Sequence, residues 1–110
     1  MEDISKTSLE SALLLVFHEL YGNIGFPPPD VVRIVGRTNT SAGRYVDLAC
    51  DSAIQYEGLL DMQGRYIELN GVENGLMAVV QVKNNRLQDI ELAAYGGASW
   101  DGQERGWAIV

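Results

Sequence analysis

The stretch LMAVVQVKNNRLQDIELAAY, residues 76–95, decides the fold of this chain. It contains two runs rich in apolar and β-branched residues, Leu76–Lys83 and Leu87–Tyr95, which are typical of β-strands. Between them stand Asn84 and Asn85, two residues that tolerate the positive φ angles of tight turns. The segment therefore predicts a β-hairpin, the clearest one in the sequence.

The register of this hairpin depends on the length of its loop. A two-residue Asn-Asn loop pairs Val82 with Leu87 and Val80 with Asp89. A three-residue loop instead sets Val80 opposite Ile90, which separates apolar and polar residues onto the two faces of the hairpin more cleanly. We favour the second register on this ground.

Strand and turn patterns fill the rest of the chain after Pro29. The remaining expected strands are Val31–Gly36, Arg44–Cys50, Ile54–Leu60, Arg65–Asn70 and a short final one at Trp107–Val110. Asp61–Gly64 predicts a hairpin turn between the third and fourth of these strands.

One helix is expected, from about Ser8 to Tyr21. Thr7 and Glu10 have the spacing of a capping box, in which each side chain accepts a hydrogen bond from the other residue's backbone. Six residues recur at helical spacing and predict an apolar stripe: Leu9, Ala12, Leu13, Val16, Phe17 and Leu20. Glu10, Ser11, His18 and Glu19 are expected on the opposite side of the helix. The 110 residues thus predict a single α+β domain, with the helix packed on one face of a five- to six-stranded antiparallel meander sheet.

Composition excludes several classes of partner. Fifteen acidic residues stand against eight basic ones, and the net charge of -7 argues against binding to nucleic acid or to an anionic membrane. The longest purely apolar run, Leu13–Phe17, is far too short to span a bilayer. Glu2 and Asp3 are acidic, whereas a signal peptide has basic residues at its start, so a cytoplasmic location is expected.

The sequence offers little support for an enzyme. His18 is the single histidine and is expected to be a solvated residue at the polar edge of the helix. Cys50 is the single cysteine, which excludes an internal disulfide, and strand alternation predicts that its thiol is buried and inert. No catalytic residue, metal site or cofactor site is therefore predicted.

One pattern points to a binding surface. If the helix covers one face of the sheet, tyrosines and acidic residues collect on the opposite face, and the loop after Gly97 can extend them. The candidate partner-binding residues are Tyr45, Asp47, Tyr66, Glu68, Asp89, Glu91, Tyr95, Trp100 and Asp101. Tyrosine rings supply contact area and carboxylates steer a basic protein partner, but an ordinary solvated sheet face has a similar composition. The pattern leaves both interpretations open.

Three segments resemble a group of small, mostly uncharacterised bacterial proteins. They are Val35-Gly36-Arg37, the strand Tyr45–Leu48 and the hairpin Gly75–Leu92. Many of these proteins carry a cysteine-rich turn after the first segment, whereas residues 38–43 here contain no cysteine, so no metal or redox role is carried over. In size, acidic charge and style the chain is also similar to immunity proteins of bacterial toxin systems, which neutralise basic nuclease toxins.

The acidic charge, the sheet face rich in tyrosine and acidic residues, and the lack of catalytic groups favour the same hypothesis as this similarity: a cytoplasmic immunity-type protein that occludes the active site of a cognate toxin. The alternative is a small-molecule-binding or enzymatic α+β domain with its pocket between helix and sheet, to which Tyr56 or His18 contributes. A third hypothesis is a homodimer joined through an edge strand or through the last hairpin.

Overall fold

The computed structural model describes residues 4–110, so Glu2 and Asp3 lie outside the described residues. Its helical elements are α1 (Ser8–Tyr21) and the short 3-10 helices η1 (Gly22–Ile24), η2 (Pro29–Val31) and η3 (Tyr95–Gly97). Its strands are β1 (Arg33–Asn39), β2 (Gly43–Ala49), β3 (Gly58–Leu60), β4 (Ile67–Leu69), β5 (Val72–Lys83), β6 (Arg86–Ala94) and β7 (Ala108–Ile109). No helix within these residues is long and apolar enough to cross a membrane.

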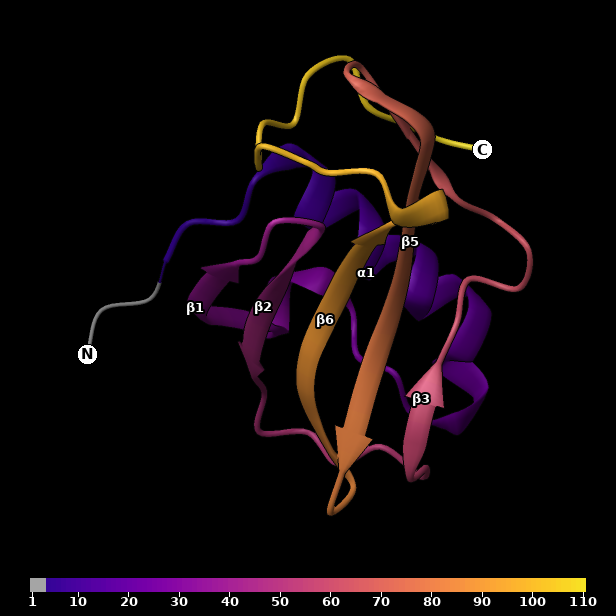
Figure 1. Ribbon diagram of the computed structural model, residues 1–110. Coiled ribbons are helices and arrows are strands. Elements are labelled where there is room, and N and C mark those ends of the chain that lie inside the picture. Colours follow the sequence, from indigo (N-terminus) through magenta and orange to yellow (C-terminus); the bar gives the residue numbers. More distant parts are fainter. Residues whose placement is uncertain (1–3) are drawn as a thin grey trace.

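The strands form one antiparallel sheet with the order β1-β2-β6-β5-β4-β7, and β3 pairs with β5. This confirms the predicted α+β class, with an N-terminal helix on one face of an antiparallel sheet (Figure 1). The finer prediction of a five- or six-stranded meander is wrong. Seven strands are present in residues 4–110, and β2 pairs with β6 instead of with the next strand along the chain.

The length of β5 explains this topology. β5 has 12 residues and pairs along one side with β6. On its other side, Leu60 of β3 pairs with Val80 and Ile67 of β4 pairs with Leu76, so β3 and β4 lie end to end along one edge of β5. The predicted turn at Asp61–Gly64 joins these two successive strands and is not a hairpin turn.

The hairpin between β5 and β6 combines the two registers that the sequence left open. Asn84 and Asn85 form a two-residue turn, with φ angles of 55° and 59°. Val82 pairs with Leu87 beside this turn, as a two-residue loop requires. A bulge then shifts the register, so that Val80 pairs with Ile90 and the apolar residues return to one face.

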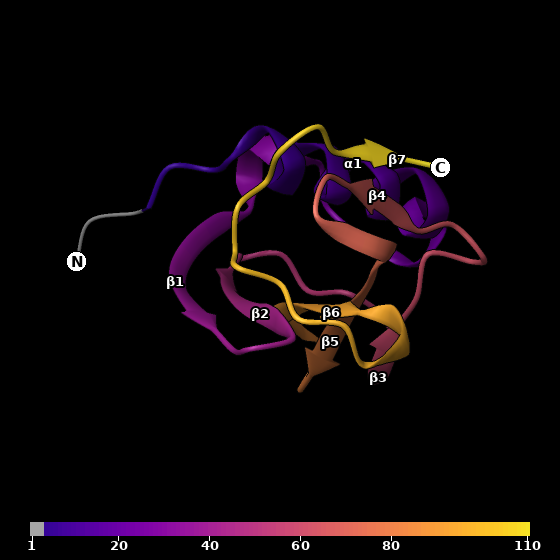
Figure 2. The ribbon, with the colours of Figure 1, turned by 45° about the horizontal axis from the view of Figure 1, so that its top comes forward.

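The concave face of the sheet and α1 enclose the core. Figure 2 shows α1 on one side, β2, β6 and β5 on the other, and β4 and β7 curling over toward the helix. The buried residues of the helix are Leu9, Glu10, Leu13, Leu14, Val16 and Phe17. They pack on inward side chains of the strands, among them Ile34, Val46, Val80, Ile90 and Leu92.

The N-terminus of α1 has the predicted capping box. The backbone N–H of Glu10 donates to Thr7 Oγ1 (3.1 Å), and the backbone N–H of Thr7 donates to Glu10 Oε1 (2.9 Å). The prediction that Glu10 lies on the side of the helix away from the apolar stripe is wrong in its consequence for burial, because the Glu10 side chain is fully buried. Arg37 of β1 reaches it from the sheet and donates from Nε to Glu10 Oε2 (2.6 Å), so the carboxylate is paired inside the protein.

His18 also differs from its prediction as a solvated residue. Its ring is half-buried, and Nδ1 lies 2.7 Å from the carbonyl oxygen of Phe26. A carbonyl oxygen can only accept, so Nδ1 carries the proton and donates it. His18 therefore holds the segment that follows the helix against α1.

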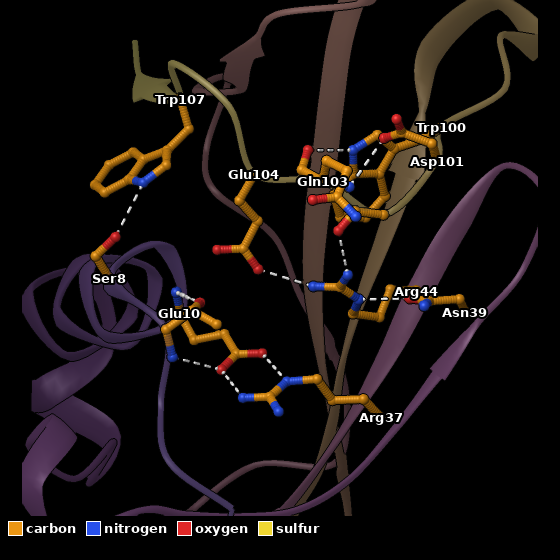
Figure 3. A network of polar contacts seen from close by, with 12 residues as sticks. Ser8, Glu10, Arg37, Asn39, Arg44, Trp100, Asp101, Gln103, Glu104 and Trp107 are labelled. Carbon is orange, nitrogen blue, oxygen red and sulfur yellow. Dashed lines mark hydrogen bonds and ion pairs between the residues drawn. The ribbon is translucent and has the colours of Figure 1, made fainter.

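Another arginine, which is itself buried, attaches the C-terminal segment 98–107 to the sheet (Figure 3). Arg44 of β2 is 7% exposed, and its guanidinium donates to Asn39 Oδ1 (2.7 Å) and to Glu104 Oε2 (2.8 Å). Its Cζ atom also lies 4.8 Å from the centre of the Trp100 ring, a cation–π distance. The segment then continues into β7, which pairs with β4 as the last strand of the sheet.

Candidate functional site

The surface of the sheet that faces away from α1 is the candidate site. Strand alternation turns Tyr45 and Asp47 of β2 away from the core, while Val46 and Leu48 are buried. The pairing of β2 with β6 sets Tyr45 opposite Glu91 and Asp47 opposite Asp89. We call the surface around Tyr45, Asp47, Asp89 and Glu91 the outer face.

Negative charge is concentrated on the outer face. The hydroxyl of Tyr45 donates to Glu91 Oε2 (3.3 Å), and the negative charge of Glu91 raises the pKa of Tyr45 above its ordinary value. Partial burial, together with the charges of Asp47 and Glu91, raises the pKa of Asp89. Within residues 4–110, none of these three carboxylates forms an ion pair with a basic side chain.

Gly36 leaves room for one of these carboxylates. It pairs with Asp47 next to a bulge in β1, and a Cβ atom at position 36 would lie 2.9 Å from Asp47 Oδ2. The carboxylate of Asp47 therefore lies over the backbone of β1 at Gly36, where no side chain is present.

Apolar side chains continue the outer face across β5 and β3. Val79 of β5 pairs with Glu91, and Leu59 of β3 pairs with Gln81, so both side chains lie on the same side of the sheet as Tyr45. Val79 is sheltered by its neighbours, but Leu59 is 59% exposed. Sequence reasoning missed Leu59 because it placed position 59 next to a strand other than β5. The outer face thus combines an acidic centre with an exposed leucine at its margin.

The structure separates the other predicted residues from this group. Tyr66, Glu68 and Tyr95 line a cavity of about 590 Å³ where β4 meets the start of β5, and none of the four outer-face residues lines it. Asp101 is exposed in the segment 98–107 and forms an ion pair with Arg105 (3.3 Å).

Trp100 is a correction to the predicted surface. It is 5% exposed because its ring packs against the guanidinium of Arg44, and its Nε1–H donates to the carbonyl oxygen of Gln103 (2.9 Å). It cannot offer contact area to a partner without leaving this site. Its role in the structure is to hold the segment 98–107.

The residues considered for catalysis are not brought together. Cys50 is buried, as predicted, and is part of the apolar core. The ring of His18 is bonded to the carbonyl of Phe26 near the end of α1. Across residues 4–110, no group of three or more His, Cys, Asp or Glu side chains is placed to hold a metal ion.

A second cavity, of about 390 Å³, lies where the end of α1 meets β3. Leu20, Tyr21 and Tyr56 are among its lining residues, whereas His18 is not. The hydroxyl of Tyr21 donates to the carbonyl oxygen of Asp61 (2.7 Å) and fixes one wall. This cavity lies between the end of α1 and the sheet, where the alternative hypothesis expects a pocket.

No protein-family model, curated protein or solved structure matches this chain. Its function is therefore inferred from the geometry of its own residues.

Proposed function

We propose that this protein is an immunity-type inhibitor, which binds a basic toxin through the outer face and covers the toxin's active site. The observation that carries the proposal is the arrangement of Asp47, Asp89 and Glu91 on two paired strands, without a basic partner among the described residues. Like charges on directly paired residues destabilise a sheet. Their presence there is explained if a cationic surface neutralises them in a complex.

The neighbouring side chains support a protein partner. Tyr45 is 40% exposed beside the carboxylates, and a tyrosine ring contributes large contact area with few rotatable bonds to immobilise. Acidic residues around such a ring speed the association of a basic partner and select against acidic ones. A nuclease toxin has a basic surface because it binds nucleic acid, and the proposal places this encounter in the bacterial cytoplasm.

The test uses the product of the gene next to the one that encodes this chain, if that product is toxic when expressed alone. Co-expression is expected to restore growth, and calorimetry with the purified pair is expected to show an affinity that falls as salt rises. The double variant Asp89→Lys/Glu91→Lys should weaken binding by roughly tenfold or more. The matched control is Glu19→Lys/Asp30→Lys, which reverses two exposed charges away from the outer face.

Two results would contradict the proposal. One is an affinity that changes neither with salt nor with reversal of Asp89 and Glu91. The other is an equal loss of affinity in the control variant, because net charge alone would then explain the effect. Circular dichroism of each variant establishes that the fold is retained.

A small-molecule-binding domain is the second candidate function. The observation that favours it is the cavity beside the end of α1, which Tyr56 lines. A thermal-shift screen with a metabolite library tests it. A hit whose stabilising effect disappears in Tyr56→Ala would support this candidate, and no hit in a broad library would count against it.

A further inference from the structure

The cavity where β4 meets the start of β5 collects chemically distinctive side chains and is larger than the cavity beside the end of α1. Its volume of about 590 Å³ lies within the range of small-molecule sites. Its lining comes from three separate parts of the chain: residues 64–75, which contain β4 and the start of β5; Tyr95 after β6; and Gly106 and Ala108 near the C-terminal end. We call it the β4 cavity.

Aromatic rings and carboxylates line the β4 cavity together. Tyr66 is half-buried and Tyr95 is 42% exposed, so both can present ring surface to a ligand. Glu68 and Glu73 supply the carboxylates, and neither forms an ion pair among the described residues. The lining contains no basic side chain.

Two glycines leave room for side chains that line the β4 cavity. Gly75 has a φ of 76°, and a Cβ atom there would lie 3.0 Å from Cδ2 of the Tyr66 ring, so this ring lies directly on the backbone of β5. Gly106 has a φ of 61°, and a Cβ atom there would lie 2.6 Å from Nδ2 of the Asn70 side chain. A larger residue at position 75 would meet both the Tyr66 ring and the backbone carbonyl oxygen of Ile67, and a larger residue at position 106 would displace the Asn70 side chain.

The backbone beneath these side chains is also fixed. The N–H of Tyr66 donates to the carbonyl oxygen of Val110 (3.2 Å), and the N–H of Val110 donates back to Tyr66 (2.9 Å). The N–H of Asn70 donates to the carbonyl oxygen of Arg105 (2.9 Å). The C-terminal segment therefore braces one side of the cavity, so that its lining is arranged before any ligand arrives.

We propose that the β4 cavity binds an organic cation, a guanidinium or primary ammonium group on a short carbon chain. Tyrosine rings attract such a cation over their faces, and carboxylates form charge-assisted hydrogen bonds with its N–H groups. The same lining repels phosphates and carboxylates. This inference goes beyond the proposed function, because no outer-face residue lines the cavity.

The cation could arrive as a free amine or as a basic side chain of a polypeptide, and the chemistry of recognition is shared. The test is an NMR titration of the full ¹⁵N-labelled chain with agmatine, with N-acetyl-argininamide, and with N-acetyl-citrullinamide. The last compound replaces the guanidinium by a neutral urea of nearly the same shape. Agmatine or the arginine compound is expected to shift the backbone amides of Tyr66, Glu68 and Glu73 in a saturable manner, and the citrulline compound is not.

Two variants localise the effect. Glu68→Gln/Glu73→Gln should weaken binding of the cation by about tenfold or more, whereas the control Glu19→Gln/Asp30→Asn, which also removes two exposed charges, should leave it unchanged. If the first variant does not fold, Tyr95→Ala provides a second test, because it removes an exposed ring and should also weaken binding.

The outcomes separate the sources and can overturn the site. Tighter binding of agmatine indicates a free amine, and tighter binding of the arginine compound indicates a polypeptide side chain. The site is refuted by equal binding of the citrulline compound, by no saturable shift with either cation, or by an equal loss in the control variant. Asp89→Lys/Glu91→Lys should leave this titration unchanged, so that failure here and failure of the toxin-binding proposal are distinguishable.

Discussion

Asp89 shows at the scale of one residue how the proposed binding surface opposes stability. Partial burial is the main reason why the pKa of Asp89 is raised, and the negative charges of Asp47 and Glu91 raise it further. A carboxyl group whose pKa is higher in the folded than in the unfolded state destabilises the folded state when it is ionised. This unfavourable contribution is fully present above the raised pKa, and it disappears as the pH falls below the ordinary value of 3.8.

We therefore expect Asp89→Asn to stabilise the protein at neutral pH, by of the order of 0.5 kcal/mol, since it removes one of two directly paired like charges. The same substitution should weaken binding of a basic partner. Urea unfolding at pH 7 and near pH 3 measures the first effect, which should be absent at the lower pH. Asp30→Asn, at an exposed position outside the sheet, is the control. A loss of stability at pH 7 would show that the carboxylate of Asp89 makes a favourable contact in the folded protein.

At the scale of the elements, the close approach of β2 to β6 depends on one glycine. Gly43 is buried at the start of β2 and pairs with Ala93. A Cβ atom added there would lie 1.8 Å from the carbonyl oxygen of Leu92, and this oxygen belongs to the backbone and cannot move aside as a side chain can. The same pairing sets Tyr45 opposite Glu91 on the outer face.

Gly43→Ala is thus expected to destabilise the protein by roughly 3 kcal/mol, at the upper end of the usual cost of overpacking. Gly64→Ala is the matched control. Gly64 has a φ of 89° but open space around its Cα atom, so its substitution should cost only the backbone strain, about 1 kcal/mol. Thermal unfolding of both variants measures the difference. Equal losses would mean that β2 and β6 can separate locally at little cost.

The elements also show what the sequence could and could not predict. Local patterns sufficed for α1, its capping box and the hairpin of β5 and β6, because each depends on residues close together in the chain. The pairing of β2 with β6 joins residues more than 40 positions apart, and no local pattern contains it. For the candidate site, alternation correctly predicted that Tyr45 and Asp47 point away from the core. It could not predict that Trp100 is buried, because that depends on the distant Arg44.

At the scale of the whole molecule, buried charge connects the helix to the sheet. Glu10 of α1 and Arg37 of β1 form a bidentate pair, and the hydroxyl of Ser8, two residues before Glu10, accepts a hydrogen bond from Nε1 of Trp107 (3.2 Å) (Figure 3). Burial by itself would raise the pKa of Glu10. The hydrogen bonds from Arg37 and from the backbone of Thr7, with the positive charges of Arg37 and Arg44, outweigh burial and lower it.

A lowered pKa means that ionised Glu10 favours the folded state. Its contribution to stability is complete above the ordinary pKa of 4.5 and is lost as the pH falls through the lowered value.

Glu10→Gln removes the charge and leaves Arg37, which keeps partial access to solvent, without its anion. We expect a loss of about 2 to 3 kcal/mol at pH 7, less than for a fully buried pair. The loss should begin to shrink as the pH falls below 4.5 and should disappear once the pH is below the lowered pKa, where the carboxylate of the folded protein is protonated. Urea unfolding at a series of pH values tests this, with Glu19→Gln as the control. A loss that stayed constant across this range would assign the effect to packing of the side chain, and the link between helix and sheet would not depend on charge.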